Sequence, residues 1–372
     1  MSEDREMHTI SFTRGVPPPE AFPTRQLGEC ATSILERDGS VVLQYHPAAG
    51  FVPLREWLAR RHGVTPEAVL VSNGSLQIQE FLTRLLTSPG DVVLVERPSY
   101  DRAITIFRRA GTLVVGVPLK PDGFDVGSLE KLVEKERPRF FYVIPDFQNP
   151  TGVTTSLAKR ERLVELAERY DFWILEDNPY RDLRYFGEEF PTIFSLDSEK
   201  VLYLSSFSKV LSPGIRVGYL IGPEQLVRQL TKMAEDTYVT PNMLGQGVVY
   251  EYCRRGWLGP NIDRLRDIYR PRLEALASAL EAYLPQAQWT RPEGGFFVGV
   301  YLPPEVDTSI LKARAQQMGV VLSDGRGFFP DGDGGSFLRL PFCAVSVEEI
   351  REGIARIGSI VNAMTVHISG RG

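Results

Sequence analysis

Short apolar runs that alternate with amphipathic stretches are the feature that most constrains the fold of this chain. The stretches Gly74–Leu86 and Leu157–Tyr170 place their apolar residues on one helical face, which predicts two helices between strands. Alternation of this kind is typical of βα units, whose strands pair in parallel. We therefore predict an α/β fold with a mainly parallel, seven-stranded sheet. The candidate strands are Ala68–Ser72, Val92–Glu96, Thr112–Pro118, Phe140–Pro145, Trp173–Glu176, Val201–Ser205 and Val217–Ile221.

The pattern changes after about Leu258. One long helix is predicted over Asn261–Tyr283. Two strands, at Gly294–Val300 and Phe337–Leu340, then belong to a separate α+β layer that ends in a helix from Val347. We expect the residues up to about position 43 to return and pack on this layer. The sequence thus predicts a large domain at 45–258 and a smaller α+β domain built from both chain ends, 1–44 and 259–372.

Length and charge limit the partners of this protein. With 372 residues, of which 43% are hydrophobic, the chain can bury a sizeable core. Its net charge of −5 argues against broad attraction to nucleic acid or anionic lipid. The cysteines Cys30, Cys253 and Cys343 suggest neither a disulfide framework nor a zinc site. No signal peptide is evident, and no apolar run approaches the ~20 residues of a membrane span. We predict a cytoplasmic protein with no nucleic-acid or membrane partner.

A lysine stands just past the apolar run Val201–Leu204. The amine of Lys209 can form an imine with an aldehyde. Ser206, Ser208 and Arg216, close to it in the sequence, can hold a phosphate. Pyridoxal 5'-phosphate (PLP) carries both an aldehyde and a phosphate, so this segment predicts a site for that cofactor. For Lys209 alone, a solvated surface charge is the better interpretation.

The cofactor ring needs an anion for its pyridine nitrogen and a donor for its hydroxyl group. Asp177 follows the run Trp173–Glu176, and its carboxylate can keep the pyridine nitrogen protonated. Tyr180 and Asn149 can donate to the ring oxygen. Each has a plainer alternative: a helix cap or solvated turn for Asp177, aromatic packing for Tyr180, and turn chemistry for Asn149 before a proline.

Two further groups complete this set. The turn at Gly74, Ser75 and Leu76 lies between a strand and a helix, so its N–H groups can point at a phosphate, although Ser75 can also be a simple cap. Tyr100 follows Val92–Glu96 and can stack on the ring, although ordinary packing also explains it. The conjunction favours the cofactor, because all these residues lie at or just past the carboxyl ends of predicted strands, where open α/β sheets bind ligands.

On these residues the chain resembles the fold-type I PLP-dependent transferases, specifically the 2-aminoadipate/kynurenine-type aminotransferases and the aminotransferase domain of MocR regulators. The resemblance covers nearly the whole chain, with the expected order and spacing. It runs through Ser11–Pro23, Tyr45–Gly50, Pro53–Arg55, Ser72–Gln77, Pro98–Tyr100, Asn149–Gly152, Glu176–Tyr180, Ser205–Tyr219, Gly294–Phe297 and Arg339–Pro341.

This resemblance implies a role for each residue. Lys209 is the Schiff-base lysine and the proton shuttle between substrate and cofactor. Asp177 pairs with the pyridinium, and Tyr100 stacks on the ring. Asn149 and Tyr180 bond the ring oxygen. The residues implied to hold the phosphate are Gly74, Ser75, Leu76, Ser206, Ser208 and Arg216.

The resemblance also implies contacts beyond the cofactor ring. Tyr45 reaches the phosphate of the neighbouring subunit, which implies a homodimer with two shared sites. Arg339 grips the α-carboxylate of the substrate with its planar fork. Without the resemblance, Arg339 is better interpreted as a surface arginine on an alternating strand.

The chain departs from its relatives near the substrate. Only about nine residues precede Ile10–Gly15, where relatives have an N-terminal arm and helix, so we expect a less covered site. Arg14, beside Gly15, stands where close relatives often have a small residue, and Arg326 lies in a loop that approaches the site in relatives. We expect Arg14 or Arg326 to meet a second acidic group on the substrate. The alternative is that both face solvent or pair with local acids.

Transamination between an L-amino acid and a 2-oxo acid is the expected activity, through a Lys209 aldimine and a quinonoid, with 2-oxoglutarate as the acceptor that the family suggests. The same quinonoid also supports β- or γ-elimination, replacement, cyclisation or carbon–carbon bond formation, and a less covered site leaves room for a large second substrate. A third hypothesis is a ligand-sensing regulator like the MocR effector domain. Only about ten residues precede the matched region, too few for a DNA-reading module.

Overall fold

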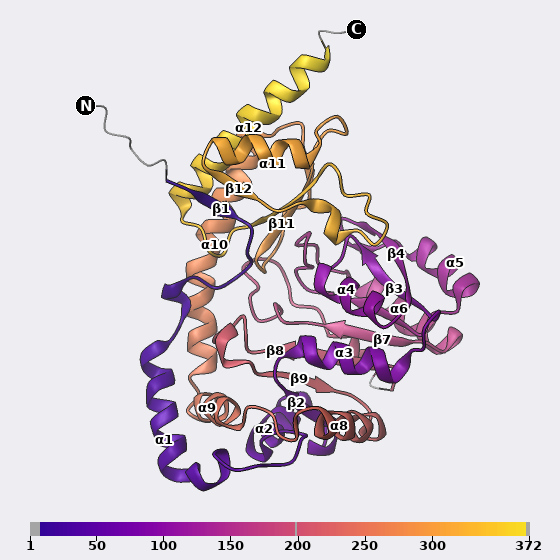
Figure 1. The fold of residues 1–372 in the computed structure, drawn as a ribbon, viewed down its shortest axis with the longest axis vertical. Coiled ribbons are helices and arrows are strands. Elements are labelled where there is room, and N and C mark those ends of the chain that lie inside the picture. The colour runs from indigo at the N-terminus through magenta and orange to yellow at the C-terminus, as the bar shows by residue number, and fades with distance from the viewer. Residues whose placement is uncertain (1–7, 198, 370–372) are drawn as a thin grey trace.

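Figure 1 shows a computed structural model of the chain, which describes residues 8–197 and 199–369. A large sheet with flanking helices lies beside a smaller layer of short sheets, and the long helix α10 (Leu258–Tyr283) runs between the two regions. The segment 1–44 predicted for the small domain begins in residues 1–7, which lie outside the described residues.

The large sheet has eight strands in the order β2-β9-β8-β7-β6-β3-β4-β5. Strands β4, β3, β6, β7 and β8 pair in parallel, while β9 runs antiparallel to both β2 and β8. All seven predicted strands are present, which confirms the mainly parallel α/β fold. The sequence pattern does not predict the eighth, because β5 is a two-residue hairpin partner of β4. The strands are β2 (Val69–Ser72), β3 (Val92–Arg97), β4 (Leu113–Lys120), β5 (Gly123–Phe124), β6 (Phe140–Val143), β7 (Trp173–Asp177), β8 (Val201–Ser206) and β9 (Gly218–Ile221).

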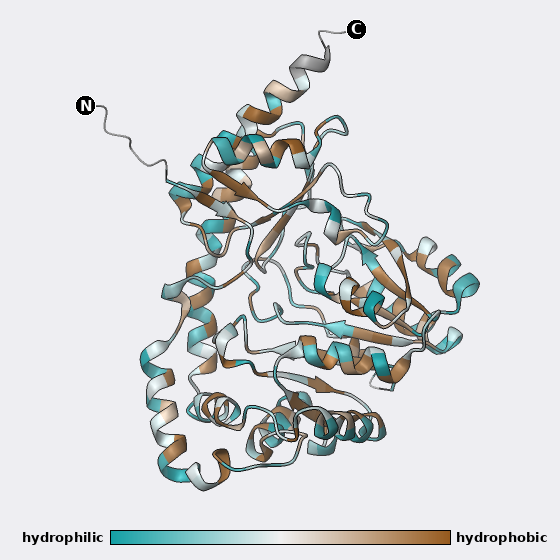
Figure 2. Cartoon of the chain, viewed as in Figure 1, coloured by the Kyte–Doolittle hydropathy of each residue, from teal (hydrophilic) through white to brown (hydrophobic). Residues whose placement is uncertain are grey.

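Every residue of β2, β6, β8 and β9 is buried, so helices and loops cover both faces of this sheet. In Figure 2 the helices around it carry both hydrophobic and hydrophilic residues, as amphipathic helices do. No helix within residues 8–197 and 199–369 is both long and apolar enough to cross a bilayer. The helices of this region are α2 (Val52–His62), α3 (Ser75–Leu86), α4 (Asp101–Arg109), α5 (Val126–Glu136), α6 (Leu157–Tyr170), α7 (Ile193–Leu196), α8 (Glu224–Tyr238) and α9 (Met243–Arg254), with short 3-10 turns at η2 (Pro66–Ala68) and η3 (Pro213–Ile215).

The smaller layer confirms the predicted α+β pattern. Its antiparallel sheet has the order β10-β11-β13, and a separate parallel pair joins β1 to β12. Helix α12 packs along α10 and also contacts α11. The elements are β1 (Ile10–Phe12), η1 (Pro19–Ala21), β10 (Gln288–Trp289), β11 (Phe297–Tyr301), α11 (Thr308–Gln317), β12 (Val320–Leu322), η4 (Gly325–Phe328), β13 (Phe337–Pro341) and α12 (Val347–Ser369).

The N-terminal segment divides between the two regions. Strand β1 pairs with β12, as expected for a segment that returns to the smaller layer. Helix α1 (Thr24–Val42) instead packs against α9. Gly247 on α9 permits this close approach, because a Cβ there would lie 2.7 Å from the side chain of Ile34. The expectation that all residues up to about 43 pack on the smaller layer is therefore wrong for α1, and the domain boundaries stay a prediction.

Three neighbouring strands determine where the site lies. Strands β6, β7 and β8 are adjacent, parallel and in register, so their carboxyl ends reach the same edge of the sheet. The chain leaves β6 toward Asn149, ends β7 at Asp177 and leaves β8 toward Lys209. In Figure 2 the carboxyl end of β7 is hydrophilic although the body of the strand is hydrophobic. Polar side chains from distant parts of the sequence therefore meet at this edge.

Candidate active site

A pocket opens at the carboxyl edge of the central sheet, between the sheet and the amino end of α3. Most of the predicted cofactor residues share its wall, together with Gln79, Ile144, Pro179 and Pro213. The predicted residues that line it are Gly74, Ser75, Leu76, Tyr100, Asn149, Asp177, Tyr180, Ser206, Ser208, Lys209 and Arg216. The fold brings these residues together, while the role of each stays a prediction.

Asp177, the last residue of β7, is buried in this wall rather than solvated in a turn. Its Oδ2 accepts hydrogen bonds from the Tyr142 hydroxyl at 2.7 Å and from Gln79 Nε2 at 2.8 Å. Its Oδ1 is buried without a hydrogen-bond partner among the described residues. Burial raises the pKa of Asp177 to about 6, although both hydrogen bonds lower it, so the carboxyl is mostly ionised at neutral pH. A buried carboxylate with one free oxygen is suited to a cationic N–H donor.

Tyr142 and Gln79 are not indicated by any sequence motif. Tyr142 lies within the apolar run of β6, where an aromatic residue is expected to be core. Gln79 lies one helical turn after Ser75 on α3, so it faces the same edge as the predicted phosphate-binding turn. A polar residue at that spacing on a mostly apolar face is the only signal that the sequence offers for it.

Lys209 places its amine inside the pocket. The Nζ donates to the carbonyl oxygen of Gly15 at 3.2 Å and lies 5.6 Å from the ring centroids of both Tyr180 and Phe296. Burial lowers the pKa of Lys209, and the positive charge of Arg339 lowers it further, while Asp177 opposes the shift. A lowered pKa increases the fraction of free amine, the form that attacks a carbonyl carbon.

One end of the pocket is suited to a phosphate. Gly74 has a φ of 100°, and α3 begins at Ser75 with no side-chain cap, so the first N–H groups of this helix are open. Ser75 is therefore not the simple cap considered as its alternative. Arg216 donates to backbone carbonyls of Asn73 and Pro213 and has no acidic partner among the described residues. Its charge and the helix amino end both favour an anion at this point.

The Ser206 hydroxyl continues this end of the pocket. It bonds the Ser208 hydroxyl at 2.8 Å and accepts from the backbone N–H of Ser208 at 3.1 Å. Gly218 permits the close packing behind them, because a Cβ there would collide with the backbone at Gly74 and Ser75. Both serines are thus held in fixed positions beside Arg216.

The aromatic and amide side chains lie along the remaining wall. Burial raises the pKa of Tyr100 to about 12 and that of Tyr180 well above its ordinary value, so both hydroxyls stay protonated and can donate. Asn149 accepts from Arg339 through its Oδ1 at 3.1 Å, which leaves its amide N–H groups for another acceptor. These three residues can therefore supply a ring face and two kinds of hydrogen-bond donor.

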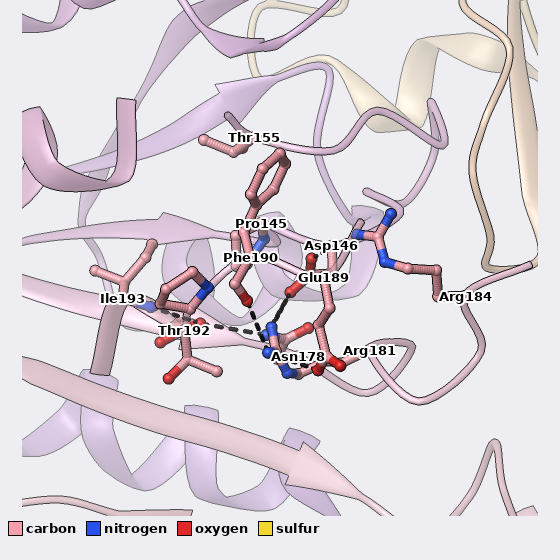
Figure 3. Close-up of polar contacts among 12 residues, drawn as sticks. Pro145, Asp146, Thr155, Asn178, Arg181, Arg184, Glu189, Phe190, Thr192 and Ile193 are labelled. Atoms are coloured by element: carbon pink, nitrogen blue, oxygen red, sulfur yellow. Dashed lines mark hydrogen bonds and ion pairs between the residues drawn. The ribbon is translucent and has the colours of Figure 1, made fainter. Parts of the chain in front are cut away.

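A buried ion-pair network behind the pocket fixes the loops that carry these residues (Figure 3). Asp146, just past β6, accepts from Arg160 at 2.8 Å. It also accepts from Asn178 at 2.9 Å and from Arg181 at 3.1 Å, and Figure 3 labels these three residues. Burial would raise the pKa of Asp146, but the arginines hold it below its ordinary value. Because Asn178 follows β7 and Asp146 shares a loop with Asn149, these bonds tie the β6 and β7 loops together.

A second buried carboxyl connects the Asn149 loop to the loop of Tyr100. Glu96 accepts from the backbone of Ile144 at 3.0 Å and from Gln148 at 3.2 Å, and Gln148 also donates to the carbonyl of Pro98 at 2.8 Å. Burial raises the pKa of Glu96 to about 8. The two loops are therefore joined through one buried carboxyl group.

Arg339 on β13 reaches the same region from the smaller layer. Its guanidinium donates to Asn149 Oδ1 and, at 3.0 Å, to the carbonyl of Thr13. The carbonyl of Gly15 accepts from Lys209, so backbone oxygens of one N-terminal segment contact two residues of the site. Gly15 also allows the ring of Phe297 to approach, since a Cβ at this position would overlap that ring.

Five predicted residues lie outside the pocket wall: Arg339 and Gly15, which contact wall residues, and Arg14, Arg326 and Tyr45. Arg14 is exposed and forms no ion pair within residues 8–197 and 199–369. Arg326 donates to Asp307 at 2.6 Å and lies 3.4 Å from Asp324. In this structure it therefore pairs with local acids, which is the alternative to a substrate contact. Tyr45 is 78% exposed in the single chain.

Comparisons with known proteins agree with this geometry. The family model described as "Aminotransferase class I and II" matches residues 14–357. The chain is 38% identical over 365 residues to the aromatic-amino-acid aminotransferase 1 of Thermococcus litoralis, which covers 95% of this chain and 88% of the relative. It is also 38% identical over 361 residues to the 2-aminoadipate transaminase of Thermus thermophilus, with 95% and 90% of the two chains covered.

Solved structures of similar proteins have the same fold. The α-aminoadipate aminotransferase of Thermus thermophilus, complexed with N-(5'-phosphopyridoxyl)-L-leucine, superposes with a TM-score of 0.92 at 36% identity and covers 96% of this chain and 93% of its own. The kynurenine aminotransferase of Pyrococcus horikoshii superposes with a TM-score of 0.92 at 35% identity, covering 95% and 91%. The match extends over both the large sheet and the smaller layer.

Proposed function

Because this chain belongs to the class I and II aminotransferases, a family of PLP-dependent transferases, we propose that it moves an amino group between an L-amino acid and a 2-oxo acid at Lys209. One observation supports this most: the free oxygen of buried Asp177 and the amine of Lys209 face one pocket, where a ring nitrogen and an aldehyde need a carboxylate and an amine. The anion-binding end at Arg216 then accommodates the phosphate.

Each residue of this site has a distinct task in the proposal. When bound, PLP supplies an aldehyde that exchanges amines and a protonated ring that accepts electron density. Lys209 binds the aldehyde and, once released, takes up and returns the proton at the substrate Cα. Asp177 holds the ring nitrogen in its protonated form. Asn149 and Tyr180 donate to the ring oxygen, Tyr100 packs on the ring face, and Arg339 holds the α-carboxylate.

A single-turnover experiment tests transamination against the other PLP reactions. We load the enzyme with PLP, add L-phenylalanine or L-2-aminoadipate without an acceptor, and quantify pyridoxamine phosphate and the 2-oxo acid by mass spectrometry. We expect about one of each per site, and we expect 2-oxoglutarate to reverse the change. Consumption of the amino acid without pyridoxamine phosphate would instead support elimination, replacement or bond formation on the same cofactor.

For the substrate we propose an amino acid with a large or acidic side chain, since relatives are named for aromatic amino acids, 2-aminoadipate and kynurenine. We propose that Arg14 is the partner of a distal carboxylate on the substrate. The residues on both sides of it contact Arg339 and Lys209, so its side chain starts at the mouth of the site. A role in amino-acid biosynthesis and a cytoplasmic location stay predictions, and cell fractionation measures the location.

Arg14→Ala is expected to raise the KM for L-2-aminoadipate about tenfold and to leave the KM for L-leucine within about twofold, because only the former offers a second carboxylate. Steady-state kinetics with both amino acids measure this difference. Arg228→Ala is the control, since Arg228 is also exposed but pairs with Glu224 on α8 and does not line the pocket. Equal effects of Arg14→Ala on both substrates would contradict the assignment.

We also propose that the enzyme works as a homodimer with shared sites. Leu43, Tyr45 and Val239 are 72%, 78% and 55% exposed. The residues next to Tyr45 and Val239 are joined by a hydrogen bond, in which the backbone N–H of His46 donates to the Thr240 hydroxyl at 2.7 Å. The two exposed segments therefore lie close together. Val239 has a φ of 62°, which is uncommon for a β-branched residue. The same loop continues to Asn242, whose N–H donates to Asn73 at the phosphate end of the pocket. A second copy on this surface would bring its own Tyr45 near a phosphate.

Tyr45→Phe is expected to weaken PLP binding about tenfold, because a hydrogen bond to a charged phosphate is lost while the aromatic ring remains. Equilibrium titration of the cofactor-free protein with PLP measures the change, and sedimentation equilibrium measures the assembly. Tyr283→Phe is the control, since Tyr283 is also an exposed tyrosine but lies at the end of α10. A monomer at all concentrations, or unchanged PLP affinity in Tyr45→Phe, would count against the shared site.

A further inference from the structure

We propose that Phe328 is a positioning residue for substrate recognition: its ring, with that of Phe297, clamps Arg339 so that the guanidinium faces a substrate carboxylate. The Cζ of Arg339 lies 4.6 Å from the ring centroid of Phe328 and 4.8 Å from that of Phe297. Both distances are within the range of a cation–π contact. The inference rests on the proposed function, in which Arg339 binds the α-carboxylate.

Arg339 forms no direct ion pair with a carboxylate among the described residues, and the carboxylate that opposes the lowering of its pKa by burial is the more distant Asp101. Its hydrogen bonds go to two neutral oxygens, Asn149 Oδ1 at 3.1 Å and the carbonyl of Thr13 at 3.0 Å, and its Nε is buried without a partner. Burial lowers the pKa of Arg339, which indicates a cation in a poorly solvated position. The ring faces, which carry partial negative charge, are therefore important for holding it until an anionic ligand arrives.

The structure fixes Phe328 firmly. It ends the turn η4, which is anchored by the pair of Arg326 with Asp307 and by the bond from Arg326 N to Asp324 at 3.0 Å. The carbonyl of Phe328 accepts from the backbone N–H of Ser99 at 2.8 Å, directly before Tyr100. By its sequence position Arg326 is a candidate substrate contact. Through its bonds to Asp307 and Asp324 it instead holds the turn that positions the Phe328 ring.

The next residue provides a matched control. Phe329 is as buried as Phe328, packs on the same ring of Phe337, and lies 5.2 Å from the guanidinium of Arg97 instead of Arg339. Replacing either phenylalanine by leucine preserves a large apolar side chain and removes one aromatic face. Only the change at Phe328 touches the clamp on Arg339.

Ligand binding without turnover tests the clamp. We load wild-type enzyme, Phe328→Leu, Phe328→Tyr and Phe329→Leu with PLP, reduce them with borohydride, and measure the Kd of 3-phenylpropanoate by calorimetry. Phe328→Leu is expected to weaken binding about tenfold, while Phe328→Tyr and Phe329→Leu stay within about twofold. In the unreduced enzymes, absorbance titrations should give weaker binding of L-phenylalanine in Phe328→Leu but unchanged binding of 2-phenylethylamine, which lacks the carboxylate.

Several results would overturn the proposal. Equal affinity for 3-phenylpropanoate in Phe328→Leu and wild type would remove the role of the ring. If Phe328→Leu and Phe329→Leu lose the same affinity for 3-phenylpropanoate, the effect belongs to the stability of the loop. If Phe328→Leu loses the same affinity for L-phenylalanine and for 2-phenylethylamine, the effect belongs to the side chain that the two ligands share. If wild type binds no 3-phenylpropanoate, Arg339 does not hold carboxylates. Failure of transamination is detected separately, by the absence of pyridoxamine phosphate in wild type.

Discussion

Lys209→Ala is expected to lower kcat by about 10⁴-fold, the largest effect of any single substitution in this enzyme, because it removes both the covalent attachment of PLP and the proton-transfer base. Single-turnover production of pyridoxamine phosphate measures the loss. After borohydride reduction of the loaded protein, peptide mass analysis should find the cofactor attached to the peptide that contains position 209 in wild type and absent from it in the variant.

Small primary amines should partly rescue this variant, since the cavity left by the side chain admits a substitute base. Methylamine at increasing concentration is expected to raise the rate of Lys209→Ala and to leave wild type unchanged. Lys232→Ala is the control, because Lys232 pairs with exposed Glu235 and Asp236 on α8, away from the pocket. Near-normal turnover of Lys209→Ala, or labelling of a different lysine, would contradict the assignment of the site.

Asp177→Asn is expected to lower kcat about 10²- to 10³-fold, by analogy with the removal of one preorganised charge partner from an active site. The amide has nearly the same shape and can still accept from Tyr142 and Gln79, but it carries no negative charge to keep the ring nitrogen protonated. Because Lys209 is intact, borohydride should still attach PLP to position 209, which separates this defect from loss of the cofactor.

The matched control is Asp182→Asn. Asp182 lies on the same loop after β7, pairs with Arg61 at 3.1 Å and is partly exposed. We expect its kcat to stay within about twofold of wild type, because an exposed ion pair contributes little. A similar loss of rate in both variants would indicate damage to the loop and would refute the special role of Asp177.

The central sheet is predictable from the sequence because its signal is local. Each strand is an apolar run, and the candidate site residues follow these runs directly, so the sequence pattern alone places Asp177, Asn149 and Lys209 at one edge of the sheet. The two-residue strand β5 has no such run. The docking of α1 on α9 depends on the space above Gly247, which no local pattern reports.

The supporting residues of the site cannot be predicted, because no local sequence pattern signals them. Tyr142 and Glu96 lie in apolar strands, and their tasks depend on the partners that the fold brings to them. Arg326 shows the same limit from the other side: an arginine in a nearby loop suggests a substrate contact, while its observed partner is Asp307, nineteen residues away in the sequence. Contacts between distant segments decide these roles, and the sequence pattern does not contain them.

The hydrogen bonds that join the N-terminal segment to Arg339 and Lys209 are accepted by the main-chain oxygens of Thr13 and Gly15. These oxygens are present whatever side chain stands at position 14, so substitutions other than glycine or proline are expected to keep both contacts. This makes the position a natural starting point for redesign. A library at this codon alone should yield enzymes with altered preference among amino donors while the chemistry at the sheet edge is retained.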